Sequence, residues 1–176
     1  SIHCDIERRY GERNFRGKLQ KMQEQEASRL YGELLGRIGS HHVDEPDFRQ
    51  LVERGCLAME TALDDPGFLG FVGVAPSAER IRFCCQQTSD ILARRPITTR
   101  RDAEMMVNWI AKATERTLSI PAAVTIMEFA AAAMGGLDQY SAFLTSGQLD
   151  DLYSQIDGNF VGLGVELKPA PDGLLI

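Results

Sequence analysis

The chain has 176 residues, a length typical of one domain or two small ones and sufficient to bury a sizeable core. Apolar residues make up 44% and charged residues 25%, which argues against a disordered chain, a collagen or a disulfide-dense miniprotein. The longest apolar run, Phe129–Met134, is far shorter than the roughly 20 residues of a membrane helix.

The net charge of −6 belongs entirely to the last third of the chain. Residues 1–120 carry 18 acids and 18 bases, whereas residues 121–176 carry seven acids and one base, Lys168. This asymmetry suggests two differently built parts. Because phosphate binding requires Lys and Arg, we expect no nucleic-acid partner. One basic cluster lies between Arg8 and Lys21, and we expect a solvated lead-in to a helix there, with contact to a membrane surface as the alternative.

The first half of the chain shows two helical patterns of apolar residues. One helix is expected over residues 15–39, with an interruption around residues 23–26 and an end at Gly39. A clearer helix is expected over residues 48–63, ended by the turn-forming sequence Asp64-Asp65-Pro66-Gly67. Residues 67–76 are then expected to form a small apolar loop.

Two further helices are expected on either side of Pro96. The third covers about residues 77–94, and the fourth starts at Thr98 or Thr99, where Thr99 and Asp102 approximate a capping box. The expected buried stripe of the third helix consists of Ile81, Cys84, Cys85, Thr88, Ile91 and Leu92. That of the fourth consists of Met106, Trp109, Ile110, Ala113 and Thr117.

The fifth helix begins at Pro121 and is apolar nearly all round, which is typical of a central helix in a bundle. Glu128 is its only charge. Burial of an unpaired carboxylate is costly, so we expect Glu128 to face an arginine, a helix N-terminus or solvent. The glycine pair at residues 135–136 is expected to end the helix.

The pattern changes after the bundle. A capping box at Thr145 predicts a short sixth helix to about Ile156, and residues 160–168 and 173–176 read as strands. The fold class is therefore mainly α, a bundle of about five helices plus a short sixth, followed by a truncated β remnant. The expected domains are residues 1–156 and 157–176. Two strands alone would be marginally stable, so we expect the sequence to be an N-terminal fragment cut inside a β-containing domain.

The cysteine and histidine patterns predict no metal site and no cofactor. Adjacent Cys84 and Cys85 point in different directions on a helix, and there is no C-x-x-C, so free thiols are expected. The pair His41-His42 has no spaced partner that would complete a metal site.

The segment 136–167 contains Gly-Leu-Asp-Gln-Tyr-Ser-Ala-Phe-Leu-Thr, then the short helix, then Phe-Val-Gly-Leu-Gly-Val-Glu-Leu. It resembles the carboxyl-terminal processing (tail-specific) protease family, in which a Leu-Asp-Pro-Tyr-Ser-x-(Phe/Tyr)-Leu segment ends a helical region and a Phe-x-Gly-Ile/Leu-Gly strand opens a PDZ domain. Gln139 stands where the family usually has proline. A structural role in the turn is expected for Asp138, Tyr140, Ser141 and Phe143.

The stretch Gly162, Leu163, Gly164 and Val165 is the expected peptide carboxylate-binding loop. A glycine loop entering a strand can turn successive N–H groups toward an anion, and a peptide can then add to the sheet edge as a further strand. An ordinary glycine-tolerant turn or bulge is the alternative. The resemblance implies C-terminal peptides of substrate proteins as partners of the complete protein.

Family members use a Ser nucleophile activated by a Lys general base. None of the four lysines fits that pattern, so no catalytic residue is expected and the chain alone should be inactive, whatever its parent does. We therefore expect a non-catalytic N-terminal fragment of a serine-type processing protease. The alternatives are a PDZ-containing scaffold without protease activity and an all-α oligomerisation or regulatory bundle. The resemblance suggests a bacterial extracytoplasmic or membrane-associated protein. Membrane contact and oligomeric state stay open.

Overall fold

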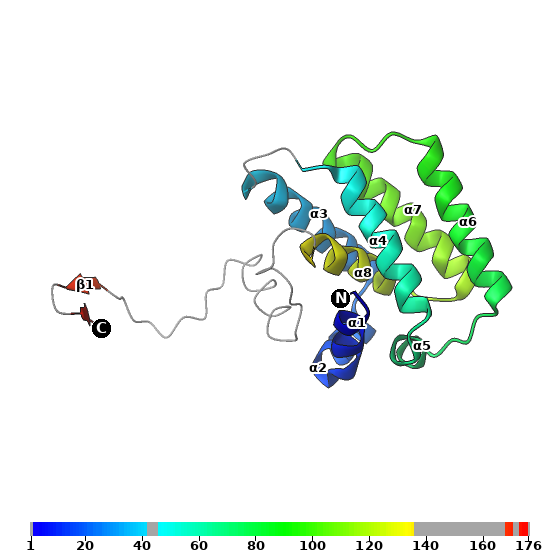
Figure 1. Cartoon of the computed structure of the whole chain (residues 1–176), viewed down its shortest axis with the longest axis horizontal. Helices are drawn as coiled ribbons and strands as arrows, with labels where there is room; N and C mark the ends of the chain where they lie inside the picture. Colours follow the sequence, from blue (N-terminus) through cyan, green and yellow to red (C-terminus); the bar gives the residue numbers. More distant parts are fainter. Residues whose placement is uncertain (1, 42–45, 136–167, 171–172, 176) are drawn as a thin grey trace.

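The computed structural model describes residues 2–41, 46–135, 168–170 and 173–175. The described part is mainly helical, as predicted (Figure 1). Its helices are α1 (Ile2–Gly11), α2 (Arg13–Lys21), α3 (Glu24–His41), α4 (Phe48–Leu63), α5 (Pro66–Val72), α6 (Ala78–Arg94), α7 (Arg100–Leu118) and α8 (Ala122–Gly135). Two short strands, β1 (Lys168–Ala170) and β2 (Gly173–Leu175), pair antiparallel with Lys168 opposite Leu175.

Helix α8 is the centre of the bundle, as its nearly uniform apolar sequence predicts. It packs most extensively against α4, and also against α3 and α7 (Figure 1). Residues 122–130 are all buried. Helix α6 covers the outer side of α7 and touches α4 lightly, whereas α1, α2 and α5 gather at one end of the bundle. A single connected core joins residues from α1 to α8.

The helix starts follow from local capping chemistry. The Asp47 carboxylate accepts the Gln50 N–H at 3.0 Å at the start of α4, and the Ser77 hydroxyl accepts the Arg80 N–H at the start of α6. At α7 the predicted capping box is confirmed, since Thr99 and Asp102 each accept the other's backbone N–H. Such caps satisfy N–H groups that have no partner within the helix.

The expected loop over residues 67–76 is wrong, because residues 66–72 form helix α5. The Asp65 carboxylate accepts the Phe68 N–H at 2.7 Å, Pro66 occupies the first helical turn, and Gly73 ends the helix with a φ of 68°. Asp-Pro followed by glycine signals a turn, but Asp and Pro are also the preferred residues of a helix start. Burial of Phe68 in the core decides the outcome in favour of the helix.

The N-terminal region is also more helical than predicted. The expected single helix over residues 15–39 is divided into α2 and α3 at Met22 and Gln23, close to the predicted interruption, and α3 continues past Gly39 to His41. Helix α1 was not predicted.

In α6, Cys84 is buried while the other five residues of the expected stripe are half-buried. In α7, Trp109 is 40% exposed. The buried stripe of α7 contains Met106 and Ile110 from the expected set, together with Ala103, Val107, Ala111, Thr114 and Leu118.

The short sixth helix and the strand over residues 160–167 lie outside the described residues, as does the boundary at residue 157. The assignment of the β1–β2 hairpin to a PDZ domain stays a prediction.

Deletion of residues 157–176 should leave the helical domain intact. Every residue of the described core lies between Ile6 and Ala133, so the deletion removes none of the residues that form this core. We expect helical circular dichroism and a cooperative thermal transition to persist. Loss of cooperativity in the shortened chain would show that the C-terminal residues belong to the core.

Candidate functional site

The residues predicted to carry peptide binding lie outside the described residues. These are the loop Gly162, Leu163, Gly164 and Val165 and the turn residues Asp138, Tyr140, Ser141 and Phe143. Their roles stay predictions. The described part instead presents a buried charge network, a cluster of thiols, two surface grooves and a set of converging ligand groups.

The buried charge network links α1 to the central helix α8. The Arg9 guanidinium donates from Nη2 to Glu128 Oε2 at 2.5 Å, and the Tyr10 hydroxyl donates to Glu128 Oε1 at 2.6 Å. The Glu128 side chain is fully buried and Arg9 is 7% exposed. The prediction that Glu128 faces an arginine, a helix N-terminus or solvent is therefore confirmed, and its partner is an arginine. The description of the basic cluster as solvated is wrong for Arg9, because this side chain supplies the charge that Glu128 requires.

Tyr10 joins this network to the aromatic packing of the same end of the bundle. Its ring meets Phe15 and Phe68 edge-on, with centroids 5.6 and 5.0 Å away. Burial raises the pKa of Tyr10 well above its ordinary value, and the adjacent Glu128 carboxylate adds to the shift. The hydroxyl therefore stays protonated and keeps donating to Glu128. The arrangement is suited to holding α1 on the core rather than to proton transfer near neutral pH.

Stability of the domain should fall at alkaline pH. Burial raises the pKa of Cys56 to about 12 and raises the pKa of Tyr10 well above its ordinary value, so the unfolded state loses both protons first. Stabilisation from each group is complete below its unfolded pKa, about 8.5 for Cys and 10 for Tyr, and is lost as pH rises toward the folded value. Urea unfolding between about pH 8 and 11 should show this decline. Tyr10→Phe should flatten its upper part, and a stability independent of pH across this range would contradict the assignment.

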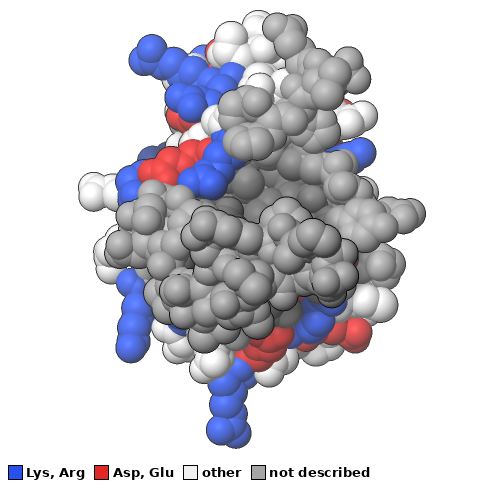
Figure 2. Space-filling model, turned by 90° about the vertical axis from the view of Figure 1, so that its left-hand side faces the viewer, with Lys and Arg blue, Asp and Glu red and all other residues white. Residues whose placement is uncertain are grey.

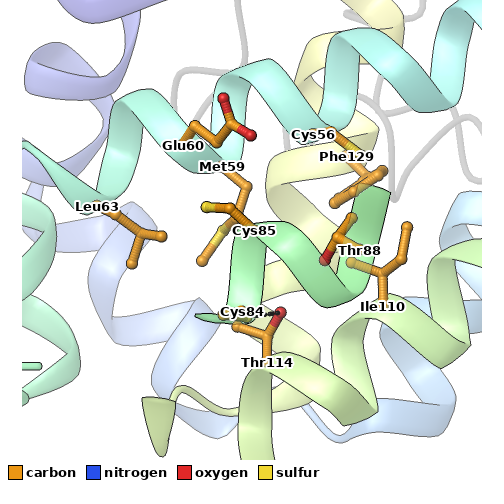
Figure 3. Close-up of a pocket in the computed structure, with 10 residues that line it drawn as sticks. All are labelled: Cys56, Met59, Glu60, Leu63, Cys84, Cys85, Thr88, Ile110, Thr114 and Phe129. Carbon is orange, nitrogen blue, oxygen red and sulfur yellow. Dashed lines mark hydrogen bonds between the residues drawn. The ribbon is translucent and has the colours of Figure 1, made fainter. Parts of the chain in front are cut away.

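Three thiols lie around a small cavity between α4, α6 and α7 (Figure 3). Cys56, Cys84 and Cys85 line it together with Thr114 and Phe129. Cys56, Cys84 and Cys85 are free thiols, as predicted. The cavity volume is about 20 Å³, enough for about one water molecule. Burial raises the pKa of all three lining thiols, so they are poor nucleophiles near neutral pH.

The environment of Lys112 does not favour a role as a general base. Lys112 contacts the carboxylates of Glu24 and Glu115, and the hydrogen bond to Glu24 raises its pKa. A lysine acting as a base needs the opposite shift. Lys21 is exposed at the end of α2, and Lys18 is half-buried on the same helix.

Two grooves open on the surface of the bundle. One, of about 420 Å³, lies between α1, α4 and the end of α8 and is lined by Ile2, Arg54 and Leu57 among others. The other, of about 470 Å³, lies where α6 meets α7, and there the Arg95 guanidinium stacks 4.1 Å from the centre of the exposed Trp109 ring. On the face shown in Figure 2, basic and acidic side chains lie close together in several places on the described surface.

Sequence reasoning missed one cluster of potential ligands, formed by His3, Glu7 and Asp65. Their ligand atoms all lie within 4.8 Å of one another. His3 and Glu7 are one helical turn apart in α1, a spacing that could have signalled a pair. Asp65 comes from the junction of α4 and α5, and no sequence spacing connects it to α1.

Comparisons with protein-family models, curated proteins and solved structures found no match to the chain. Among the described residues, no helix combines the length and the apolar character needed to cross a membrane.

Proposed function

We propose that the chain is the N-terminal, non-catalytic part of a serine-type carboxyl-terminal processing protease, in which it helps to recognise or gate the C-termini of substrate proteins. The observation that carries this proposal is the segment 136–167, with its Leu-Asp-Gln-Tyr-Ser turn and its Phe-Val-Gly-Leu-Gly strand entry. Both occur in the order and spacing of that family.

The architecture supports this proposal through the position of the segment. The resembling residues begin directly after Gly135, where α8 ends. Helix α8 is the central helix of the bundle and packs against α3, α4 and α7, so the segment follows an element that the core holds in place. A binding module that follows it would start from a fixed point on a rigid helical base. Such a base could orient a peptide relative to a catalytic domain encoded further along.

The chemistry of the described residues supports a non-catalytic role. A Ser–Lys mechanism needs a desolvated lysine of lowered pKa beside a serine hydroxyl. The hydrogen bond that Lys112 donates to the Glu24 carboxylate instead raises the pKa of Lys112. Under this proposal, the nucleophile and the base belong to a part of the protein outside this sequence.

Proteolysis assays on two proteins test this function. One is the 176-residue chain, and the other is the longer protein encoded by the complete gene. Each would be incubated with model proteins that carry apolar or charged C-terminal tails, and cleavage would be detected by intact-mass spectrometry. We expect the longer protein to shorten apolar tails preferentially, the 176-residue chain to leave them unchanged, and replacement of the catalytic Ser by Ala in the longer protein to abolish cleavage. A longer protein that binds such tails without cleaving them would favour the scaffold function. A longer protein that neither binds nor cleaves them would contradict the proposal.

A further inference from the structure

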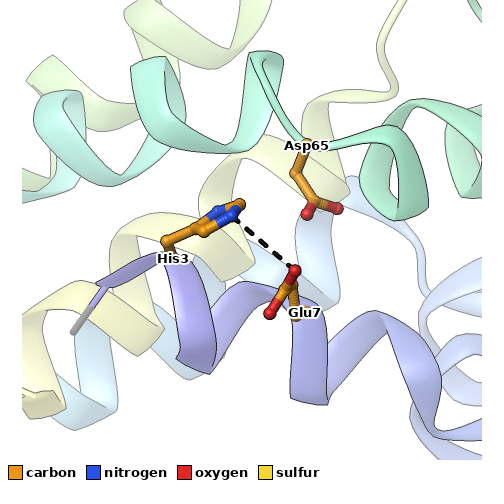
Figure 4. Close-up of side chains that lie close together, drawn as sticks. All are labelled: His3, Glu7 and Asp65. Atoms are coloured by element: carbon orange, nitrogen blue, oxygen red, sulfur yellow. Dashed lines mark ion pairs between the residues drawn. The ribbon is translucent and has the colours of Figure 1, made fainter.

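We propose that His3, Glu7 and Asp65 form a binding site for a divalent transition-metal ion of the zinc class, which fastens the start of α1 to the α4–α5 junction. Figure 4 shows the three side chains converging on one space between these elements. This inference is independent of the proposed protease function, because it uses none of the residues on which that function rests.

The distances are close to those of a three-ligand metal site. His3 Nε2 lies 3.7 Å from Glu7 Oε1, and all three ligand atoms fall within 4.8 Å. Tetrahedral ligands at the usual bond length of about 2.0–2.1 Å lie about 3.3 Å apart. The site therefore needs the His3 and Glu7 ligand atoms to approach by about 0.4 Å, and the other two pairs to approach by up to about 1.5 Å. The His3 and Glu7 side chains are 54% and 60% exposed, so both can rotate toward the ion.

The buried carboxylate of Asp65 favours the binding of a cation by this cluster. Its side chain is buried, at 2% exposure, and its Oδ1 accepts the Phe68 N–H. Among the described residues, no lysine or arginine forms an ion pair with this carboxylate. A buried carboxylate without a cation is costly, and a second carboxylate, Glu7, lies beside it. A divalent ion would balance both negative charges.

The donor set selects the class of metal. One imidazole nitrogen and two carboxylate oxygens suit zinc and neighbouring transition metals better than Mg²⁺ or Ca²⁺, which prefer oxygen ligands alone. Three protein ligands leave a fourth position for water. Arg9 and Tyr10 attach the last turn of α1 to Glu128. A metal ion at the first turn would attach the opposite end of the same helix.

Calorimetric titration of the 176-residue chain with ZnCl₂ tests the site. We expect one ion per chain, and Asp65→Asn and His3→Gln should each weaken binding at least about tenfold, since even residues that only support ligands change affinity by about 10–100-fold. Asn is also a good helix cap, so Asp65→Asn should keep α5 folded, which circular dichroism can verify. Zinc should raise the thermal midpoint of the original chain and not that of the variants.

Two matched controls remove potential zinc ligands elsewhere in the chain, the histidine pair and the thiol on α1. A His41→Gln/His42→Gln double variant and a Cys4→Ser variant should bind zinc as the original chain does. Loss of binding in either control with retention in Asp65→Asn would overturn the assignment. Equal affinity for Mg²⁺ and Zn²⁺ would contradict the role of His3 as a ligand.

Discussion

Arg9→Ala is expected to destabilise the helical domain by about 3–5 kcal/mol, the usual cost of removing one partner from a buried ion pair. Among the described residues, Arg9 and Tyr10 are the hydrogen-bond donors to the fully buried Glu128 carboxylate, so the substitution leaves it with the Tyr10 hydroxyl. It also removes one of the contacts that hold α1 on the core. Total stabilities of domains are about 5–15 kcal/mol, so the loss would be a large share. Urea unfolding monitored by circular dichroism measures it.

An exposed arginine provides the matched control. Arg29 pairs with Glu33 one turn further along α3 and is 52% exposed, so Arg29→Ala should cost about 0.5 kcal/mol or less. An Arg9→Met/Glu128→Leu double variant should recover most of the loss, because it removes both charges and keeps the volume apolar. A cost for Arg9→Ala no larger than that for Arg29→Ala would show that the network does not hold α1 in place.

Gly55→Val is expected to cost about 3 kcal/mol or more, at the upper end of the range for overpacking. A Cβ atom at residue 55 would lie 2.2 Å from Cδ1 of Phe129, far inside normal contact distance. The Phe129 ring is fully buried and cannot move into solvent. The close approach of α4 to α8 therefore depends on the absence of a Cβ atom at residue 55. Thermal unfolding of the variant measures the effect.

Gly17→Ala is the matched control for this prediction. Gly17 lies inside α2, and a Cβ atom there would meet no atom within 4 Å. Alanine should then stabilise the helix by about 0.5–1 kcal/mol through its higher propensity. A Gly55→Val protein as stable as the original would contradict the observed packing of α4 against Phe129.

The sequence predicts the middle and end of the helical domain well because several signals agree there. Helices α4, α6, α7 and α8 combine apolar periodicity with caps or proline stops, and the structure places them close to the expected bounds. Helix α1 is polar on most of its surface, and its attachment depends on Glu128, 119 residues away from Arg9. A local pattern contains no information on such a pair. Helix α5 was missed because its capping residues also form turns.

The same physical reason limits prediction of the ligand cluster. His3 and Glu7 are connected by helical spacing, but Asp65 reaches them through the packing of α5 against α1. For Trp109, the sequence pattern predicts burial and the structure shows an exposed ring. Its position fits the apolar stripe of α7, yet the cation–π contact with Arg95 lets its ring remain at the surface. Tertiary contacts decide both cases.

The most direct test of the proposed function is the binding of matched peptides to a chain extended through the complete β-containing domain. Peptides with a free apolar C-terminus should bind, and amidation of that terminus should weaken binding by about 1.5–3 kcal/mol, the value of a hydrogen bond to a charged group. Gly164→Val should cause a similar loss if the loop requires a positive φ. Fluorescence anisotropy with acid and amide forms of one peptide measures the difference. Stronger binding of the acid is the result that we predict, and equal binding of the two forms would contradict the assignment of residues 162–165 as a carboxylate-binding loop.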